Sequence, residues 1–224
     1  MTRTSHRQVN RRQGGDNVAM LRKTSRFGAL LLAALLLAAC SGSTPKLDRL
    51  DAGAVVLAFG DSLTFGAGAS PAESYPAVLE RTIGRKVVNA GVPGEISEQG
   101  LARLPEALEE AQPKLLILCH GGNDFLRRLD EARAAENIRA MIRLARGKGI
   151  AVVLLATPKP GLPPSVPKFY GEIAAELGVP FEDGVIKSVL FDNKLKSDMI
   201  HPNARGYAEI AAALQKLLKK AGAL

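Results

Sequence analysis

The feature of this sequence that most constrains its fold is a series of short apolar runs that alternate with amphipathic segments. The runs have the length of β-strands, and most of them are apolar throughout rather than alternating with polar residues. Such strands, separated by helices, are typical of a parallel sheet that is covered on both faces. We therefore predict an α/β domain with strands over residues 54–59, 86–90, 115–119, 150–156 and 179–182, and helices over residues 74–83, 97–111, 130–146, 166–177 and 203–220.

Two local details of the helices also follow from residue type. Pro105 lies inside the second predicted helix and is expected to bend or split it, because proline has no backbone N–H to donate. Asn203 is expected to cap the last helix, and Gly222 lies just beyond its end. The five prolines between residues 157 and 167 predict an ordered loop after the fourth strand.

The positive charge of the chain is concentrated at its N-terminus. The formal net charge is +8, but residues 1–27 contain seven of the basic side chains and one acidic one, which leaves the remainder close to neutral. A nucleic-acid-binding domain needs a basic patch on its folded surface. The charge balance therefore gives no reason to expect a nucleic-acid partner.

The basic segment precedes an apolar run over residues 27–39, which has the length of a signal-peptide core and is too short to span a bilayer as a helix. Small residues followed by Cys40 resemble a bacterial lipobox, which implies a diacylated Cys40 and, with Ser41 next, sorting to the outer membrane. We expect residues 1–39 to be a removed leader, 40–50 a lipidated tether and 51–224 the folded domain of a periplasmic lipoprotein. A plain secretory signal is the alternative, and the start codon is either Met1 or Met20.

Two distant segments together supply the parts of a nucleophilic hydrolase. Ser62 follows the first predicted strand, and Asp198 and His201 lie three residues apart before the last helix. A serine needs a base within hydrogen-bonding reach, and a carboxylate that orients the base completes the set. We predict Ser62 as nucleophile, His201 as base and Asp198 as its partner. The other histidines are His6, in the leader, and His120, which we interpret as a partly buried imidazole that packs or hydrogen-bonds near the site.

Groups that could bind an oxyanion follow the ends of three successive strands. They are the backbone N–H groups of Ser62 and Gly94 and the side-chain amide of Asn123. The carboxyl ends of parallel strands share one edge of the sheet, where ligands bind in such folds. We predict that these three residues form an oxyanion hole and that Asp61 supports the serine turn.

Other chemistries have little support in the sequence. The chain has no His-Glu-x-x-His motif, so metal-dependent hydrolysis is not expected, and no cofactor-binding motif was identified. Of the two cysteines, Cys40 is expected to carry lipid and Cys119 lies in an apolar run, where cysteine behaves as a small hydrophobic residue. A disulfide within the mature chain is therefore not predicted.

Taken together, the motifs resemble those of the SGNH (GDSL) hydrolase superfamily. The matching blocks are Gly60-Asp61-Ser62-Leu63-Thr64, Gly94, Gly122-Asn123-Asp124 and Asp198-x-x-His201-Pro202. Residues 89–105 resemble the bacterial periplasmic thioesterase, lysophospholipase and arylesterase branch. The resemblance implies a flavodoxin-like three-layer α/β/α fold, a Ser-His-Asp triad, no metal and ester substrates. His120 departs from the aliphatic residue common in that branch, and the loop at 157–167 is expected to affect substrate choice.

The resulting functional hypothesis is a membrane-tethered esterase that hydrolyses acyl esters or thioesters, including lysophospholipid-like lipids, through an acyl-enzyme. One alternative keeps the chemistry and removes O-acetyl groups from cell-envelope glycans. Another is a lipoprotein that binds an envelope ligand without turning it over. A deep apolar groove beside the serine would favour acyl chains. The sequence predicts neither the acyl-chain length nor the oligomeric state.

Overall fold

The structure is a computed structural model that describes residues 1, 2, 4 and 44–224. It separates into Met1–Ser43 and Thr44–Leu224, and the named strands and helices belong to the second unit. The predicted signal segment and Cys40 lie outside the described residues. Among the described residues, no helix is both long enough and apolar enough to cross a membrane.

The centre of the domain is a five-stranded sheet in which every pair of neighbouring strands is parallel. The strands are β1 (Val55–Gly60), β2 (Lys86–Gly91), β3 (Leu115–Cys119), β4 (Ala151–Leu155) and β5 (Phe181–Glu182). Their order across the sheet is β2-β1-β3-β4-β5, so β2 lies on one side of β1 and β3, β4 and β5 follow on the other. The predicted fold class is therefore confirmed.

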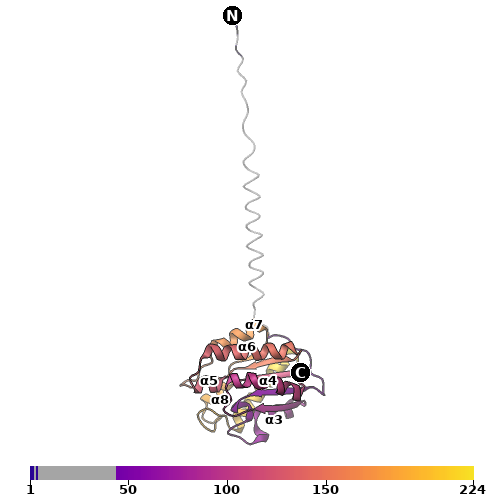
Figure 1. Cartoon of the computed structure of the whole chain (residues 1–224), viewed down its shortest axis with the longest axis vertical. Coiled ribbons are helices and arrows are strands. Elements are labelled where there is room, and N and C mark those ends of the chain that lie inside the picture. The colour runs from indigo at the N-terminus through magenta and orange to yellow at the C-terminus, as the bar shows by residue number, and fades with distance from the viewer. Residues whose placement is uncertain (3, 5–43) are drawn as a thin grey trace. The chain divides into compact units, whose positions relative to one another are not determined.

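Helices cover both faces of this sheet, as apolar strands require. Alternate residues of β1 point to opposite faces: Val56 and Ala58 join one apolar cluster, and Leu57 and Phe59 join the other. The first cluster is completed by α3 (Tyr75–Ile83), α8 (Val185–Phe191) and α9 (Ala204–Ala221), and the second by α4 (Ser97–Ala111), α6 (Glu131–Gly147) and α7 (Lys168–Leu177). Figure 1 shows α6 and α7 on one side of the sheet and α3 on the other.

Most predicted elements are present, with two kinds of difference. Of the two predicted effects of Pro105, the split is wrong, because α4 continues through it as one helix. The proline removes a single N–H donor while Leu104, Ala107 and Leu108 stay buried against the sheet. The short helices α2 (Ser62–Phe65), α5 (Gly122–Leu126) and α8 and the 3₁₀ turn η1 (Pro71–Glu73) were not predicted. Elements of three to seven residues are too short to give a clear periodic signal.

The two ends of the described domain lie against each other. The N–H of Leu47 donates to the carbonyl of Ala221, and the N–H of Leu50 donates to that of Ala223, both at 2.9 Å. Leu50 is buried in the same cluster as α9. The second half of the predicted 40–50 segment is thus held against the last helix.

Candidate active site

Ser62 is the first residue of α2 and follows the sharp turn at Asp61 that ends β1, and this turn is shaped by its neighbours. The carboxylate of Asp61 accepts a hydrogen bond from the N–H of Leu63 at 3.0 Å and so caps α2. Gly60 is required by packing, because a Cβ there would lie 2.0 Å from the carbonyl oxygen of Cys119 on β3. The absence of a side chain lets β1 and β3 run close together up to the serine.

The segment that carries His201 is brought to this turn by α9 and the chain before it. The hydroxyl of Tyr207, on the first turn of α9, donates to the carbonyl of Ala67 at 2.7 Å. A Cβ on Gly68 would lie 2.1 Å from Ser197 Oγ, so this glycine lets the two loops touch. Asn203 caps α9 as predicted, accepting from the N–H groups of Arg205 and Gly206.

These contacts place Ser62, His201 and Asp198 in one hydrogen-bonded line. His201 Nδ1 lies 2.8 Å from Asp198 Oδ2, and His201 Nε2 lies 3.1 Å from Ser62 Oγ. With the hydrogen on Nδ1 donated to the carboxylate, Nε2 accepts from the serine hydroxyl. The other oxygen of Asp198 accepts from the N–H groups of Ile200 and His201, each at 2.8 Å. Partial burial tends to raise the pKa of Asp198, but these hydrogen bonds outweigh it and leave the pKa below its ordinary value.

The three predicted oxyanion residues differ in how they lie relative to the pocket beside Ser62. The amide nitrogen of Asn123 lies 3.3 Å from Asp61 Oδ2 and 3.1 Å from the carbonyl oxygen of Glu95, and it donates to both. Asn123 and Ser62 line the same pocket, whereas Gly94 is not among its lining residues. Gly94 adjoins Glu95 and has a φ of +78°, a conformation that favours glycine.

A pocket of about 400 Å³ opens beside Ser62. Its walls come from the Ser62 turn, α5, the proline-rich loop, the end of α8 and the loop that carries Asp198. Two of the apolar lining residues, Leu162 and Met199, are 94% and 86% exposed and lie on its rim. The apolar lining is formed by Leu63, Leu126, Pro158, Pro160, Leu162, Pro164, Leu190, Met199 and Ile200.

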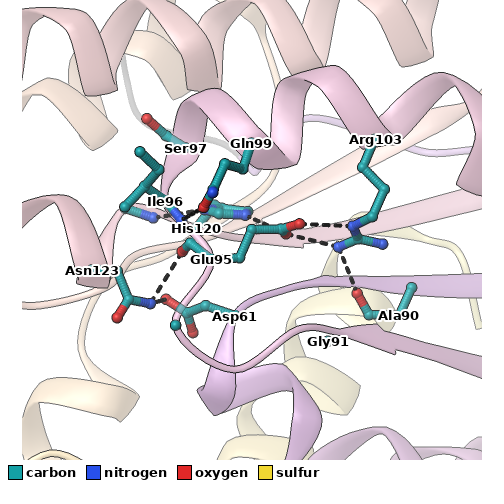
Figure 2. A network of polar contacts seen from close by, with 12 residues as sticks. Asp61, Ala90, Gly91, Glu95, Ile96, Ser97, Gln99, Arg103, His120 and Asn123 are labelled. Atoms are coloured by element: carbon teal, nitrogen blue, oxygen red, sulfur yellow. Dashed lines mark hydrogen bonds and ion pairs between the residues drawn. The ribbon is translucent and has the colours of Figure 1, made fainter.

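His120 is fully buried, and its surroundings differ from those of His201. Its Nε2 lies 3.1 Å from Glu95 Oε2, while Nδ1 accepts from the N–H of Gly121 at 3.2 Å. Arg103 donates to both oxygens of the same carboxylate at 2.8 Å (Figure 2). Burial tends to raise the pKa of Glu95, but the hydrogen bonds from Arg103 and His120 outweigh it and lower the pKa to about 2.

Asp61 has the opposite balance. It is 1% exposed, and burial raises its pKa above the ordinary value despite the opposing influence of His120 and the hydrogen bond from Leu63. Its hydrogen bond from Leu63 supports the serine turn, as predicted, and it also accepts from Asn123, which was not predicted. Among the described residues, no group of three or more His, Cys, Asp or Glu side chains could hold a metal ion.

Sequence reasoning did not identify several residues around the site. The ion pair between Glu95 and Arg103 joins the loop before α4 to a residue within α4, and no sequence motif indicates this pair. The pocket residues Leu126, Leu190 and Met199 come from short helices and a loop. Elements this short give no periodic pattern that would mark these residues in the sequence.

Comparison with known proteins agrees with this geometry. The chain matches the model of the GDSL-like Lipase/Acylhydrolase family over residues 58–209. It is 33% identical over 185 residues to the esterase TesA of Pseudomonas aeruginosa, covering 75% of this chain and 89% of that protein. It is 30% identical over 179 residues to thioesterase 1/protease 1/lysophospholipase L1 of Escherichia coli K12, covering 76% of this chain and 86% of that one.

Solved structures show the same relation. The crystal structure of TesA matches with a TM-score of 0.66 at 28% identity, covering 74% of this chain and 98% of that one. The family predicted from the motifs is confirmed, as is an esterase- or thioesterase-like function. The chain belongs to the GDSL-like lipase/acylhydrolase (SGNH) family, and it is a carboxylic ester hydrolase.

Proposed function

We propose that this protein hydrolyses acyl esters or thioesters through an acyl-enzyme on Ser62, with His201 as the base and Asp198 as its orienting partner. The observation that carries the proposal is the continuous line of hydrogen bonds from Asp198 through His201 to Ser62, with the serine lining an apolar pocket. Each bond has a length at which a proton can be transferred. The same line would serve both halves of the reaction.

In the first half, Ser62 Oγ attacks the ester carbonyl carbon while His201 Nε2 takes the hydroxyl proton. The imidazolium is stabilised by Asp198, whose lowered pKa keeps the carboxylate ionised at neutral pH. Collapse of the tetrahedral intermediate breaks the bond to the leaving alcohol or thiol, which receives the proton from His201. In the second half, His201 deprotonates a water that attacks the acyl carbon, and Ser62 leaves with the proton.

The oxyanion is stabilised by the N–H of Ser62, the N–H of Gly94 and the amide of Asn123. Both amide hydrogens of Asn123 have partners in the structure, and the contact with Asp61 is the longer one, at 3.3 Å. The oxyanion would replace this contact, while the bond to the carbonyl of Glu95 holds the amide in place. Replacing one such donor typically lowers turnover by roughly 10²–10³.

The pocket favours acyl chains over acetyl groups. A volume of about 400 Å³ with an apolar lining exceeds what one acetyl group fills. Burial of each CH₂ group contributes about 0.8 kcal/mol, so a longer chain gains binding energy along the pocket. Of the two substrate hypotheses, the acyl ester or thioester is therefore favoured over the glycan O-acetyl ester.

We also propose that the domain over residues 51–224 is exported and held at the periplasmic side of the outer membrane by lipid on Cys40. The support is the signal-like segment over residues 1–39 and the lipobox-like sequence before Cys40. Metabolic labelling with a palmitate analogue would label the full-length protein but not its Cys40→Ala variant. Equal labelling of both would contradict the anchor.

The test of the proposed function is a series of p-nitrophenyl esters from acetate to palmitate, beside an acetylated glycan. We expect kcat/KM to rise from acetate to medium chains and Ser62→Ala to lower it at least about a thousandfold. A fluorophosphonate probe should label the wild type and leave Ser62→Ala unlabelled. Full activity in Ser62→Ala would contradict the mechanism, and a preference for the glycan would favour the alternative substrate.

A further inference from the structure

Glu95 connects the helix that follows it to the end of a strand 25 residues later in the sequence. It belongs to the loop between β2 and α4, and its carboxylate lies between Arg103 of α4 and His120, which follows β3 (Figure 2). Arg103 Nε and Nη2 each lie 2.8 Å from one of its oxygens, and His120 Nε2 lies 3.1 Å away. Arg103 also donates to the carbonyl of Ala90 at 3.0 Å, which fixes the guanidinium against β2.

Burial leaves the side chains of this network little freedom to move. The side chain of His120 is 0% exposed and that of Glu95 is 6% exposed. Because His120 Nδ1 accepts from the N–H of Gly121, Nε2 carries the hydrogen that is donated to Glu95. Gly100 leaves room for the ring, since a Cβ there would lie 2.3 Å from His120 Nε2. The carboxylate therefore has one well-packed position.

The backbone of Glu95 connects this network to the reaction site. Its carbonyl oxygen accepts from the Asn123 amide at 3.1 Å, and the preceding residue is Gly94. The position of this carbonyl therefore sets the direction of the Asn123 amide.

We propose that His120 and Arg103 are positioning residues that clamp Glu95 and thereby aim the Asn123 amide at the oxyanion. The inference rests on the proposed function, because it assigns Asn123 the role of oxyanion donor. It differs from a purely structural role for a buried ion pair, which would change the stability of the fold and leave turnover intact. A misplacement of about 1 Å in a reacting group can cost about 10²-fold in rate.

The first test compares two replacements of His120. In His120→Leu the donor to Glu95 is lost, and we expect kcat to fall about 10- to 100-fold with KM within about twofold, because an oxyanion donor acts mainly in the transition state. In His120→Gln an amide N–H can reach Glu95, and most of the lost kcat should return. Equal losses in both variants, or a loss in KM alone, would overturn the proposal.

The second test asks whether the effect passes through Asn123. In an Asn123→Ala background, the further loss caused by His120→Leu should shrink to less than about twofold, because the group it positions is gone. Additive losses would show that His120 acts by another route and would overturn the proposal.

A third test replaces Arg103 and uses Arg139, an arginine of α6 on the same face of the sheet, as the matched control. Arg103→Gln should lower kcat like His120→Leu, while Arg139→Gln should leave it unchanged. Arg139 is similarly exposed, at 22% against 27%, and binds Glu176 and Glu136 on the surface of α6 and α7. A similar change in kcat in both arginine variants would overturn the proposal.

Two further measurements distinguish a failure of the positioning role from a failure of the proposed function. If His120→Leu does not fold, Glu95→Gln keeps the backbone and weakens both contacts, and unchanged kcat in that variant would overturn the inference. If Ser62→Ala keeps full activity, the proposed function itself fails. If Ser62→Ala and Asn123→Ala lose activity while folded His120→Leu and Arg103→Gln do not, only the positioning role fails.

Discussion

Two carboxylate–imidazole pairs occur in the same domain, and they differ in what surrounds them. Asp198 and His201 are 53% and 20% exposed on a loop, with 2.8 Å between the bonded atoms. Glu95 and His120 are 6% and 0% exposed, with 3.1 Å between the bonded atoms and Arg103 on the same carboxylate. By residue type alone, either pair could hold a catalytic base.

The partner of the second ring nitrogen separates the two. In His201 this nitrogen faces the hydroxyl of Ser62, a group that can give up its proton to an imidazole. In His120 the second ring nitrogen accepts from the backbone N–H of Gly121, and an amide N–H does not give up its proton to an imidazole. A buried imidazole with both nitrogens in fixed bonds is suited to holding a neighbour in place, whereas one beside a nucleophile and a pocket is suited to moving a proton.

The largest expected effect comes from breaking the exposed pair at its imidazole. His201→Ala should lower kcat/KM at least about a thousandfold, because the serine loses its base. Its thermal stability should stay close to that of the wild type, since the ring is on a loop. Steady-state hydrolysis of a p-nitrophenyl ester and a melting curve measure both. A loss no greater than that of His120→Leu would reverse the roles assigned to the two histidines.

A smaller loss is expected when the carboxylate of that pair is removed. Asp198→Ala should lower kcat about 10²-fold, less than the roughly 10⁴-fold seen when a fully buried triad carboxylate is lost, because water can reach this exposed position. The lowered pKa of Asp198 keeps the carboxylate ionised at neutral and alkaline pH, so the loss should be the same at pH 7 and pH 8.5. Unchanged kcat in the variant would show that His201 needs no partner.

The difference between the pairs also shows how far the sequence alone could lead. The strands and long helices were predictable because runs such as 115–119 are apolar throughout and α6 has a clear helical period. The order of motifs placed Ser62, Gly94 and Asn123 after strand ends. The topology of a parallel sheet brings such positions to one edge without further information.

The remainder depends on tertiary contacts that leave no local pattern. Nothing in the sequence distinguishes Glu95 from other acidic loop residues, because its contacts with Arg103 and His120 form only in the folded domain. His120 was expected to be partly buried, and the structure shows it fully buried. The pocket wall around Leu190 comes from α8, a helix of seven residues that gives no clear periodicity. Short elements and long-range ion pairs are fixed by packing, so they were not predictable from the order of residues.

A substitution at the neighbouring Gly100 should strain the Glu95–His120 pair while leaving both of its side chains unchanged. Gly100→Ala would place a Cβ 2.3 Å from His120 Nε2, and the fully buried ring has little room to move. We expect a loss of about 1–3 kcal/mol in the free energy of unfolding, measured by urea denaturation. Gly147→Ala is the control, because a Cβ there meets nothing within 4 Å and alanine is the better helix former. Equal stability of Gly100→Ala and the wild type would indicate a more mobile ring.

The smallest effect concerns the protonation of Glu95, and its sign follows from the direction of the pKa shift. The carboxyl has a pKa of about 2 in the fold against 4.5 ordinarily, so between these values the unfolded chain binds more protons. The stabilisation is therefore complete above about pH 4.5 and is lost as the pH falls toward 2. Glu95→Gln, which cannot ionise, should lack this loss.

The comparison to measure is the difference in unfolding free energy between the wild type and Glu95→Gln. At pH 7 it should be about 1.5–3 kcal/mol in favour of the wild type, the size of hydrogen bonds to a charged group. In urea titrations it should be nearly the same at pH 5 as at pH 7 and should shrink at pH 4 and again at pH 3. Asp198→Ala offers the contrast, because its carboxylate is half exposed and solvent screens it, so a smaller change with pH is expected. A constant difference for Glu95→Gln would mean that the buried carboxylate is not held ionised by Arg103 and His120.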